Sequence, residues 1–185
     1  MAREFQKIIV MGLGYIGLPT ASMLATKGHQ VLGVDVNAQA VDTINSGRIH
    51  IIEPDLDILV KSAVNSGNLK ASLTPEEGDT FILAVPTPFK EADGNPKAPD
   101  LAYIEAATRA IAPYLREDNL VILESTSPVG TTERVQEIIV AMRPELDGKI
   151  HTAHCPERVL PGQILRELVD NDRIIGGTTK AAVAK

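Results

Sequence analysis

Short apolar runs alternate with longer segments that carry polar residues at helical spacing along most of the chain. The apolar runs are typical of strands buried on both faces of a sheet, and the intervening segments are typical of covering helices. Strands are predicted over residues 7–11, 30–35, 68–72, 80–85, 120–124, 150–154 and 173–176. Helices are predicted over residues 16–27, 38–46, 55–66, 101–115, 131–142 and 163–169. This alternation indicates an α/β fold, a Rossmann-like doubly wound and mainly parallel sheet with helices on both faces.

Composition narrows the class of protein. Aromatic residues make up only 3% of the 185 residues, so the core must be built from aliphatic side chains, which suits a covered parallel sheet. The net charge of −6 gives no support for binding nucleic acid or an anionic membrane. A single cysteine excludes an intrachain disulfide and fits a reducing compartment. No apolar run is long enough to span a bilayer, so we expect a cytoplasmic protein.

A glycine-rich turn follows the first predicted strand. Gly12, Gly14 and Gly17 form the pattern G-x-G-x-x-G, in which the first glycine allows a tight turn. The second lets a pyrophosphate approach the backbone, and the third lets the next helix pack against the strand. The free N–H groups and positive dipole end of that helix would then bind the phosphates.

Asp35 ends the second predicted strand, near the spacing at which a Rossmann acid meets the adenosine ribose. The alternative is a strand-end acid that caps the following helix, and the glycine pattern favours the ribose. Val36 and Asn37 supply no base for a 2′-phosphate, so the predicted cofactor is NAD rather than NADP.

Three further turns follow strands at the sheet edge where ligands bind in open α/β folds. Thr87 lies between two prolines, and Thr126 lies in a run of three hydroxyl side chains. Thr126 is either a ligand contact or a plain helix cap. Glu157 and Arg158, in the third turn, are either site residues or a surface ion pair of little energetic value.

Two residue types suggest chemistry that we do not expect here. Cys155 has no recognisable His or Lys partner, so a buried structural thiol is favoured over a nucleophile. His151 and His154 would face opposite sides of one strand, so no metal site is predicted.

Four stretches together are similar to the motifs, in the same order, of the UDP-glucose/GDP-mannose dehydrogenase family, in its N-terminal NAD-binding domain. They are residues 12–19, 85–88, 124–130 and 155–162, and the connection Glu53–Pro54 also fits. The third turn, with Pro161, is similar to the branch of the family that oxidises UDP-N-acetyl-D-mannosamine. The UDP-glucose branch usually carries a glutamate at the position of Pro161.

The resemblance implies roles for individual residues. Tyr15 and Ile16 would contact the dinucleotide beside the glycines, and Asp35 would hold the ribose. Thr87 and Thr126 would contact the nicotinamide half.

The remaining roles that the resemblance implies concern the sugar and the chemistry. Arg158 and Val159 would bind the nucleotide sugar. Glu157 would match the family's site glutamate, which handles water or a proton in the later steps, with Thr126 in support.

The family reaction oxidises one alcohol carbon twice, through a cysteine thiohemiacetal and thioester, with two NAD. Its cysteine, in a Gly-Gly-x-Cys stretch, and its helical lysine and asparagine have no match here. We therefore expect residues 1–177 to be the NAD-binding domain and 178–185 to begin a following helix. On this interpretation the chain stops before the central helix and UDP-sugar domain of a homodimeric enzyme, and alone binds NAD without turnover.

Three alternatives remain open. The substrate could be UDP-glucose or UDP-N-acetylglucosamine. The enzyme could be a hydroxyacid or 6-phosphogluconate dehydrogenase, although the turns at 125–130 and 155–162 do not fit. A non-enzymatic NAD-sensing Rossmann module would explain the missing nucleophile, but not those two turns.

Overall fold

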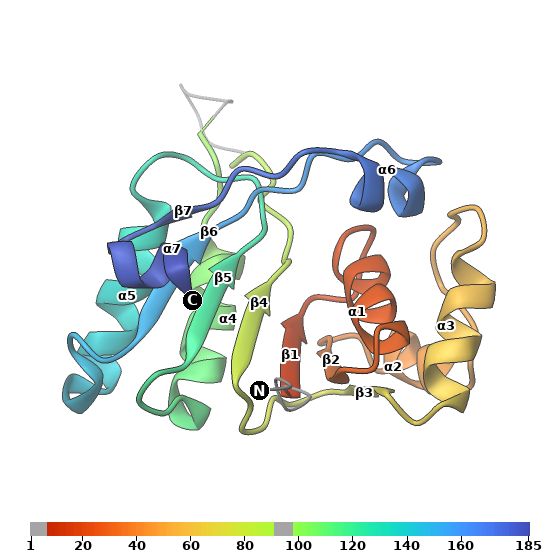
Figure 1. Ribbon diagram of the computed structural model, residues 1–185, viewed down its shortest axis with the longest axis horizontal. Coiled ribbons are helices and arrows are strands. Elements are labelled where there is room, and N and C mark those ends of the chain that lie inside the picture. Colours follow the sequence, from red (N-terminus) through yellow and green to blue (C-terminus); the bar gives the residue numbers. More distant parts are fainter. Residues whose placement is uncertain (1–6, 91–97) are drawn as a thin grey trace.

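The computed structural model describes residues 7–90 and 98–185, and its centre is one seven-stranded sheet (Figure 1). The strand order is β3-β2-β1-β4-β5-β6-β7, and every neighbouring pair is parallel except β6 with β7. The strands are β1 (Lys7–Met11), β2 (Gln30–Val34), β3 (Leu69–Ser72), β4 (Thr80–Leu83), β5 (Leu120–Leu123), β6 (His151–His154) and β7 (Gly176–Gly177). The six parallel strands have the Rossmann order, with the switch point between β1 and β4. The predicted fold class is confirmed.

One face of the sheet is covered by the first three helices, α1 (Gly17–Thr26), α2 (Ala38–Asn45) and α3 (Leu56–Asn65) (Figure 1). Ile8 and Val10 of β1 point to this side and pack with Leu18 of α1 and Val60 of α3. All four side chains are almost completely buried. This layer holds α1 against the switch point, where the glycine turn leads into it.

The other face is covered by α4 (Ala102–Ile111) and α5 (Thr131–Met142). Ile9, Phe81 and Leu123 of the sheet pack there against Ile104 and Ile139 of these helices. The helix predicted to reach residue 115 ends at 111 and continues as the 3₁₀ turn Ala112–Tyr114. Pro113, which has no backbone N–H, explains this change of helix type. A second 3₁₀ turn, Pro144–Leu146, leads into β6.

The last part of the chain crosses the top of the sheet and returns along β6. Helix α6 (Ile164–Asp170) lies beside α1, and α7 (Lys180–Ala184) lies against β6 and β7 (Figure 1). The last strand is predicted over 173–176 but is the two-residue antiparallel β7, which pairs with Ala153 and His154 of β6. Within the described residues no helix is long and apolar enough to cross a membrane.

Candidate functional site

The glycine turn between β1 and α1 has the geometry that a dinucleotide needs. Gly12 has φ +90°, and a Cβ there would lie 2.7 Å from the Ala84 carbonyl oxygen. A Cβ on Gly17 would lie 1.8 Å from the Gly12 carbonyl oxygen, so helix and turn touch through backbone alone. A Cβ on Gly14 would meet nothing within 4 Å. The first and third glycines are therefore required for packing, and the second faces open space for a ligand.

The N-terminus of α1 is free to bind an anion. No side chain caps it, and its first turn contains no acidic residue. Its backbone N–H groups and dipole therefore face the space beside Gly14, which fits the pyrophosphate of a dinucleotide.

Asp35 stands directly beyond β2 and reaches back to the glycine turn. One carboxylate oxygen accepts a hydrogen bond from the Leu13 backbone N–H at 2.9 Å, and the other accepts one from the Asn37 N–H at 2.9 Å. Asn37, not Asp35, caps α2, through bonds from the backbone N–H groups of Gln39 and Ala40. The capping alternative for Asp35 is therefore not what the structure shows, and ribose binding stays a prediction.

A pocket of about 260 Å³ opens next to the glycine turn, at the carboxyl ends of β4 and β5. It brings together Thr87 and Thr126, which were predicted to contact the nicotinamide half, with other residues of the predicted site. Its lining is Tyr15, Ile16, Ala84, Val85, Pro86, Thr87, Ser125, Thr126 and Glu157. The walls come from four turns that are far apart in the sequence.

Hydrogen bonds connect these turns in a chain. The Thr87 hydroxyl donates to the Thr126 carbonyl oxygen at 2.7 Å, and the Thr126 hydroxyl donates to Glu157 Oε1 at 3.0 Å. The buried Ser125 hydroxyl donates to the Val85 carbonyl oxygen at 2.6 Å. These bonds fix Glu157 at the pocket wall, with its hydroxyl partner already in place.

The backbone around Glu157 is also held. Its N–H donates to the Glu124 carbonyl oxygen at 3.1 Å, and its Oε2 accepts a bond from the Val159 N–H at 3.2 Å. No ion pair between Glu157 and Arg158 is found in the described part of the chain. Arg158 is exposed, and the Asn171 side chain donates to its carbonyl oxygen at 2.7 Å. The substrate roles of Arg158 and Val159 stay predictions.

Sequence reasoning missed two buried acids that support this region. Glu53, 5% exposed, accepts bonds of 2.7 Å from the backbone N–H groups of Gly162 and Ile164. It therefore holds the end of the turn that carries Glu157. Glu53 stands beside Pro54 in the connection that fits the family pattern, but its partners lie more than a hundred residues away in the sequence, and no local pattern reveals them.

The second missed acid is Glu124, which is 2% exposed. Its Oε1 accepts bonds from the Thr20 hydroxyl and the Arg173 guanidinium, both at 3.2 Å. Burial raises the pKa of its carboxyl, and the Arg173 hydrogen bond acts in the opposite direction. An acid directly after a buried apolar strand was the available signal.

Cys155 is buried, and Arg173 approaches its sulfur at 3.8 Å. His151 lies next to Asp118, and His154 contacts the Leu123 carbonyl oxygen, so the two imidazoles have separate partners. Within residues 7–90 and 98–185, no three His, Cys, Asp or Glu side chains lie close enough together to hold a metal ion.

The geometry agrees with comparisons to known proteins. Residues 6–185 match the model of the UDP-glucose/GDP-mannose dehydrogenase family, NAD binding domain. The chain is 59% identical to an NDP-N-acetyl-D-galactosaminuronic acid dehydrogenase from Ralstonia nicotianae, over 95% of this chain and 43% of that protein. It is 57% identical to a UDP-N-acetyl-D-mannosamine dehydrogenase from Campylobacter jejuni, over 96% of this chain and 45% of that protein.

Solved structures give the same picture. The UDP-N-acetyl-mannosamine dehydrogenase of Staphylococcus aureus superposes with a TM-score of 0.87 at 46% identity, over 96% of this chain and 43% of that one. The chain thus spans less than half the length of these relatives. The predicted cofactor, NAD, is confirmed by the family assignment. Together, the glycine turn, the strand order and these matches show that the chain belongs to the UDP-glucose/GDP-mannose dehydrogenase family, as its NAD-binding domain.

Proposed function

We propose that this chain is the NAD-binding part of a longer nucleotide-sugar dehydrogenase. That enzyme would oxidise UDP-N-acetyl-D-mannosamine to UDP-N-acetyl-D-mannosaminuronate, with two NAD. The UDP-sugar site would be completed by residues outside this chain. We also propose a cytoplasmic homodimer as the working form.

The observation that carries this proposal is the series of hydrogen bonds that links Thr87, Thr126 and Glu157 in the pocket beside the glycine turn. A non-catalytic NAD sensor needs the glycine turn, but has no need of a carboxylate fixed at the edge of the nicotinamide pocket. Such a fixed acid suits proton handling next to a reacting carbon.

Each residue then has a part in the reaction. When bound, NAD supplies the hydride acceptor. Thr126 donates to Oε1 of Glu157 and so keeps this carboxylate turned toward the pocket. Glu157 accepts a proton from water or from the substrate oxygen. Arg158 is exposed in the same turn, next to Glu157, and its guanidinium binds the nucleotide sugar.

A second candidate substrate is the N-acetylgalactosamine epimer. It is favoured by the 59% identity to the Ralstonia nicotianae protein, which is slightly higher than the 57% identity to the Campylobacter jejuni mannosamine dehydrogenase. UDP-glucose is less well supported, because Pro161 occupies the position where that branch has a glutamate.

Two measurements test the proposal. The 185-residue chain should bind NAD in a calorimetric titration and should form no NADH with any UDP-sugar. The full-length enzyme should form two NADH for each molecule of UDP-N-acetylmannosamine and none with UDP-glucose. Faster turnover with the N-acetylgalactosamine epimer would show that this epimer is the substrate. No turnover of the full-length enzyme with any UDP-sugar would refute the proposed dehydrogenase activity.

Glu157→Gln tests the role of the carboxylate, because glutamine keeps an oxygen for the Thr126 hydroxyl but does not accept the proton. It should abolish turnover and leave NAD affinity unchanged. Glu133→Gln, at an exposed position of α5, is the matched variant and should leave both unchanged.

A further inference from the structure

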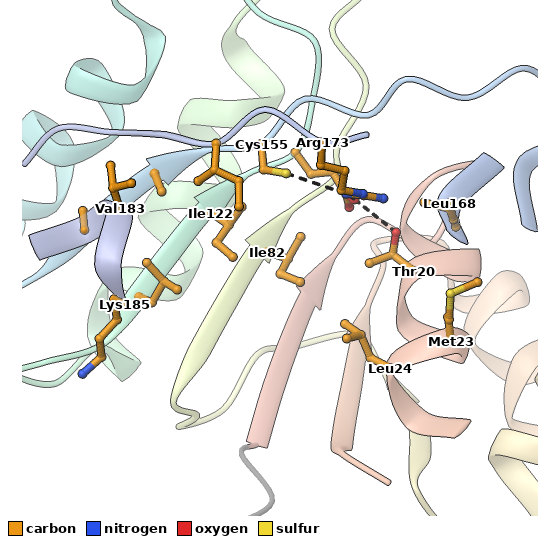
Figure 2. A pocket seen from close by; sticks show the side chains of 15 residues that line it. Thr20, Met23, Leu24, Ile82, Ile122, Cys155, Leu168, Arg173, Val183 and Lys185 are labelled. Carbon is orange, nitrogen blue, oxygen red and sulfur yellow. Dashed lines mark hydrogen bonds and ion pairs between the residues drawn. The ribbon is translucent and has the colours of Figure 1, made fainter. Parts of the chain in front are cut away.

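Glu124 directly follows β5 and is bonded to three segments that are distant from one another in the sequence. Its Oε1 accepts hydrogen bonds from the Thr20 hydroxyl of α1 and from the Arg173 guanidinium, both at 3.2 Å. Figure 2 shows Thr20 and Arg173 pointing toward each other at this place, with these bonds dashed. The Glu124 backbone carbonyl oxygen accepts the N–H of Glu157 at 3.1 Å. One residue therefore links the helix after the glycine turn to the turn that carries Glu157.

The two acids also interact through their charges. Glu124 is 2% exposed, and its ion pair with Arg173 supplies the counter-charge that a buried carboxylate requires. Burial is the main reason why the pKa of the Glu124 carboxyl is raised, and the negative charge of Glu157 adds to this effect. Such an interaction is mutual, so an ionised Glu124 also acts on the proton affinity of Glu157. Glu157 thus stands close to a buried pair of opposite charges.

The other titratable groups around this pair are engaged elsewhere or exposed. Helix α1 contains no charged residue, so it contributes only the Thr20 hydroxyl. In α6 the charged side chains are bonded to one another or to backbone, and they are Arg166, Glu167 and Asp170. The remaining groups are Cys155 beside Arg173, His154 bonded to the Leu123 carbonyl oxygen, Tyr15 on the pocket wall, and the exposed Arg158 and Asp172. In the part of the chain that the structure describes, Arg173 is the only basic side chain bonded to Glu124.

We propose that Glu124, paired with Arg173, is a positioning residue for Glu157 and balances the charge that the Glu157 carboxylate experiences. This inference rests on the proposed function, because it requires Glu157 to accept a proton during the oxidation. While both members of the pair are charged, their effects on Glu157 largely cancel. If one charge is removed, the other acts on Glu157 without compensation, in a buried region where salt and water screen it poorly.

The pH dependence of kcat/KM tests the inference in the full-length enzyme, with UDP-N-acetylmannosamine and NAD. The acid limb of this profile reports the ionisation of the essential base in the free enzyme. Glu124→Gln keeps an oxygen for Thr20 and Arg173, and its NH₂ group replaces Oε2, which has no hydrogen-bond partner among the described residues. The substitution therefore removes the charge and keeps the bonds. Because Arg173 is then uncompensated, the limb should move about 0.5 pH unit or more toward lower pH.

Three further variants separate charge from structure. Arg173→Gln leaves the Glu124 carboxylate without its counter-charge, so the limb should move toward higher pH. The double variant Glu124→Gln with Arg173→Gln removes both charges and should return the limb to its wild-type position. Glu117→Gln is the matched control, because it removes the exposed acid of an ion pair of 3.4 Å with Lys149, before the start of β5 and so at the opposite end of that strand from Glu124. It should not move the limb.

A purely structural role for Glu124 would lower the rate equally at all pH values. An unmoved acid limb in whichever single variants fold would therefore overturn the inference, even if kcat falls. A double variant that keeps the shift of Glu124→Gln would also overturn it, because the uncompensated charge would not be the cause.

The wild-type measurement separates this inference from the proposed function. If the wild-type enzyme forms no NADH with UDP-N-acetylmannosamine or its N-acetylgalactosamine epimer, the proposed function fails, and this inference fails with it. If NADH forms and the limb stays in place in the variants, only the assignment of Glu124 fails.

Discussion

Replacing Glu53 tests how the turn that carries Glu157 is held. In the wild type, the Glu53 carboxylate accepts two backbone hydrogen bonds of 2.7 Å, from Gly162 and Ile164. Glu53→Ala removes both acceptors and leaves two N–H groups at the start of α6 without partners. The turn keeps its contacts to Glu124 and Asn171, so it should loosen at one end and not detach.

The magnitude follows from these two bonds. A hydrogen bond to a charged group contributes about 1.5–3 kcal/mol, and water can reach part of this turn, so we expect a loss of about 3 kcal/mol. For a chain of this size, that corresponds to a fall in Tm of about 6–12 °C. Hydrogen exchange of the Gly162 and Ile164 amides should accelerate. NAD affinity should stay within about two-fold, because the glycine turn lies elsewhere.

Two variants calibrate the result. Glu53→Gln keeps one acceptor oxygen but turns an NH₂ group toward the second N–H, so its Tm should fall between those of the wild type and Glu53→Ala. Glu77→Ala removes an exposed carboxylate whose ion pair with Arg116 spans 3.6 Å, and should change stability by less than about 1 kcal/mol. A fall in Tm for Glu53→Ala no larger than that for Glu77→Ala, with unchanged amide exchange, would show that Glu53 does not hold the turn.

Three other substitutions have expected outcomes. Asp35→Ala should weaken NAD affinity at least about ten-fold by calorimetry, because its carboxylate is placed for the ribose and also fixes the glycine turn. Adding Asn37→Arg should shift the cofactor preference toward NADP. The second substitution should also cost about 1 kcal/mol of stability, because the side-chain cap of α2 is lost. Unchanged NAD affinity in the first variant would exclude the ribose role. Gly14→Ala should fold normally yet lose NAD binding, whereas Gly17→Ala should fail to fold, and thermal melts of both check this. Glu124→Gln tests the raised pKa of that carboxyl: as pH rises from about 4.5 through the raised pKa, folded wild type loses stability relative to the variant, and denaturant unfolding at several pH values measures the difference. A pH-independent difference would contradict the raised pKa.

The strands and the site turns could be predicted from local sequence. Each parallel strand is a short apolar run between polar residues, so its position follows from the residues themselves. The turns at Thr87, Thr126 and Glu157 come directly after such runs, and parallel strands deliver their carboxyl ends to one edge of the sheet. That is why residues seventy positions apart could be expected in one pocket. Their contacts with NAD and with the sugar remain predictions.

The ends of some helices and strands were harder to predict from the sequence. The helix predicted to reach residue 115 ends at Ile111, and the last strand is shifted to Gly176–Gly177. The first boundary is set by Pro113, and the second by which residues pair with Ala153 and His154 of β6. Such interactions leave no periodic pattern in the sequence.

The amino-acid sequence by itself determined the Rossmann fold, the NAD cofactor and the family, because each depends on short segments whose residue types are required locally. The tertiary structure alone decided what Glu53 and Glu124 contact. Their partners are separated by tens to more than a hundred residues, and a buried carboxylate selects its donors by position in space. Local physics therefore specifies the elements of this protein, and long-range packing specifies how the site is assembled from them.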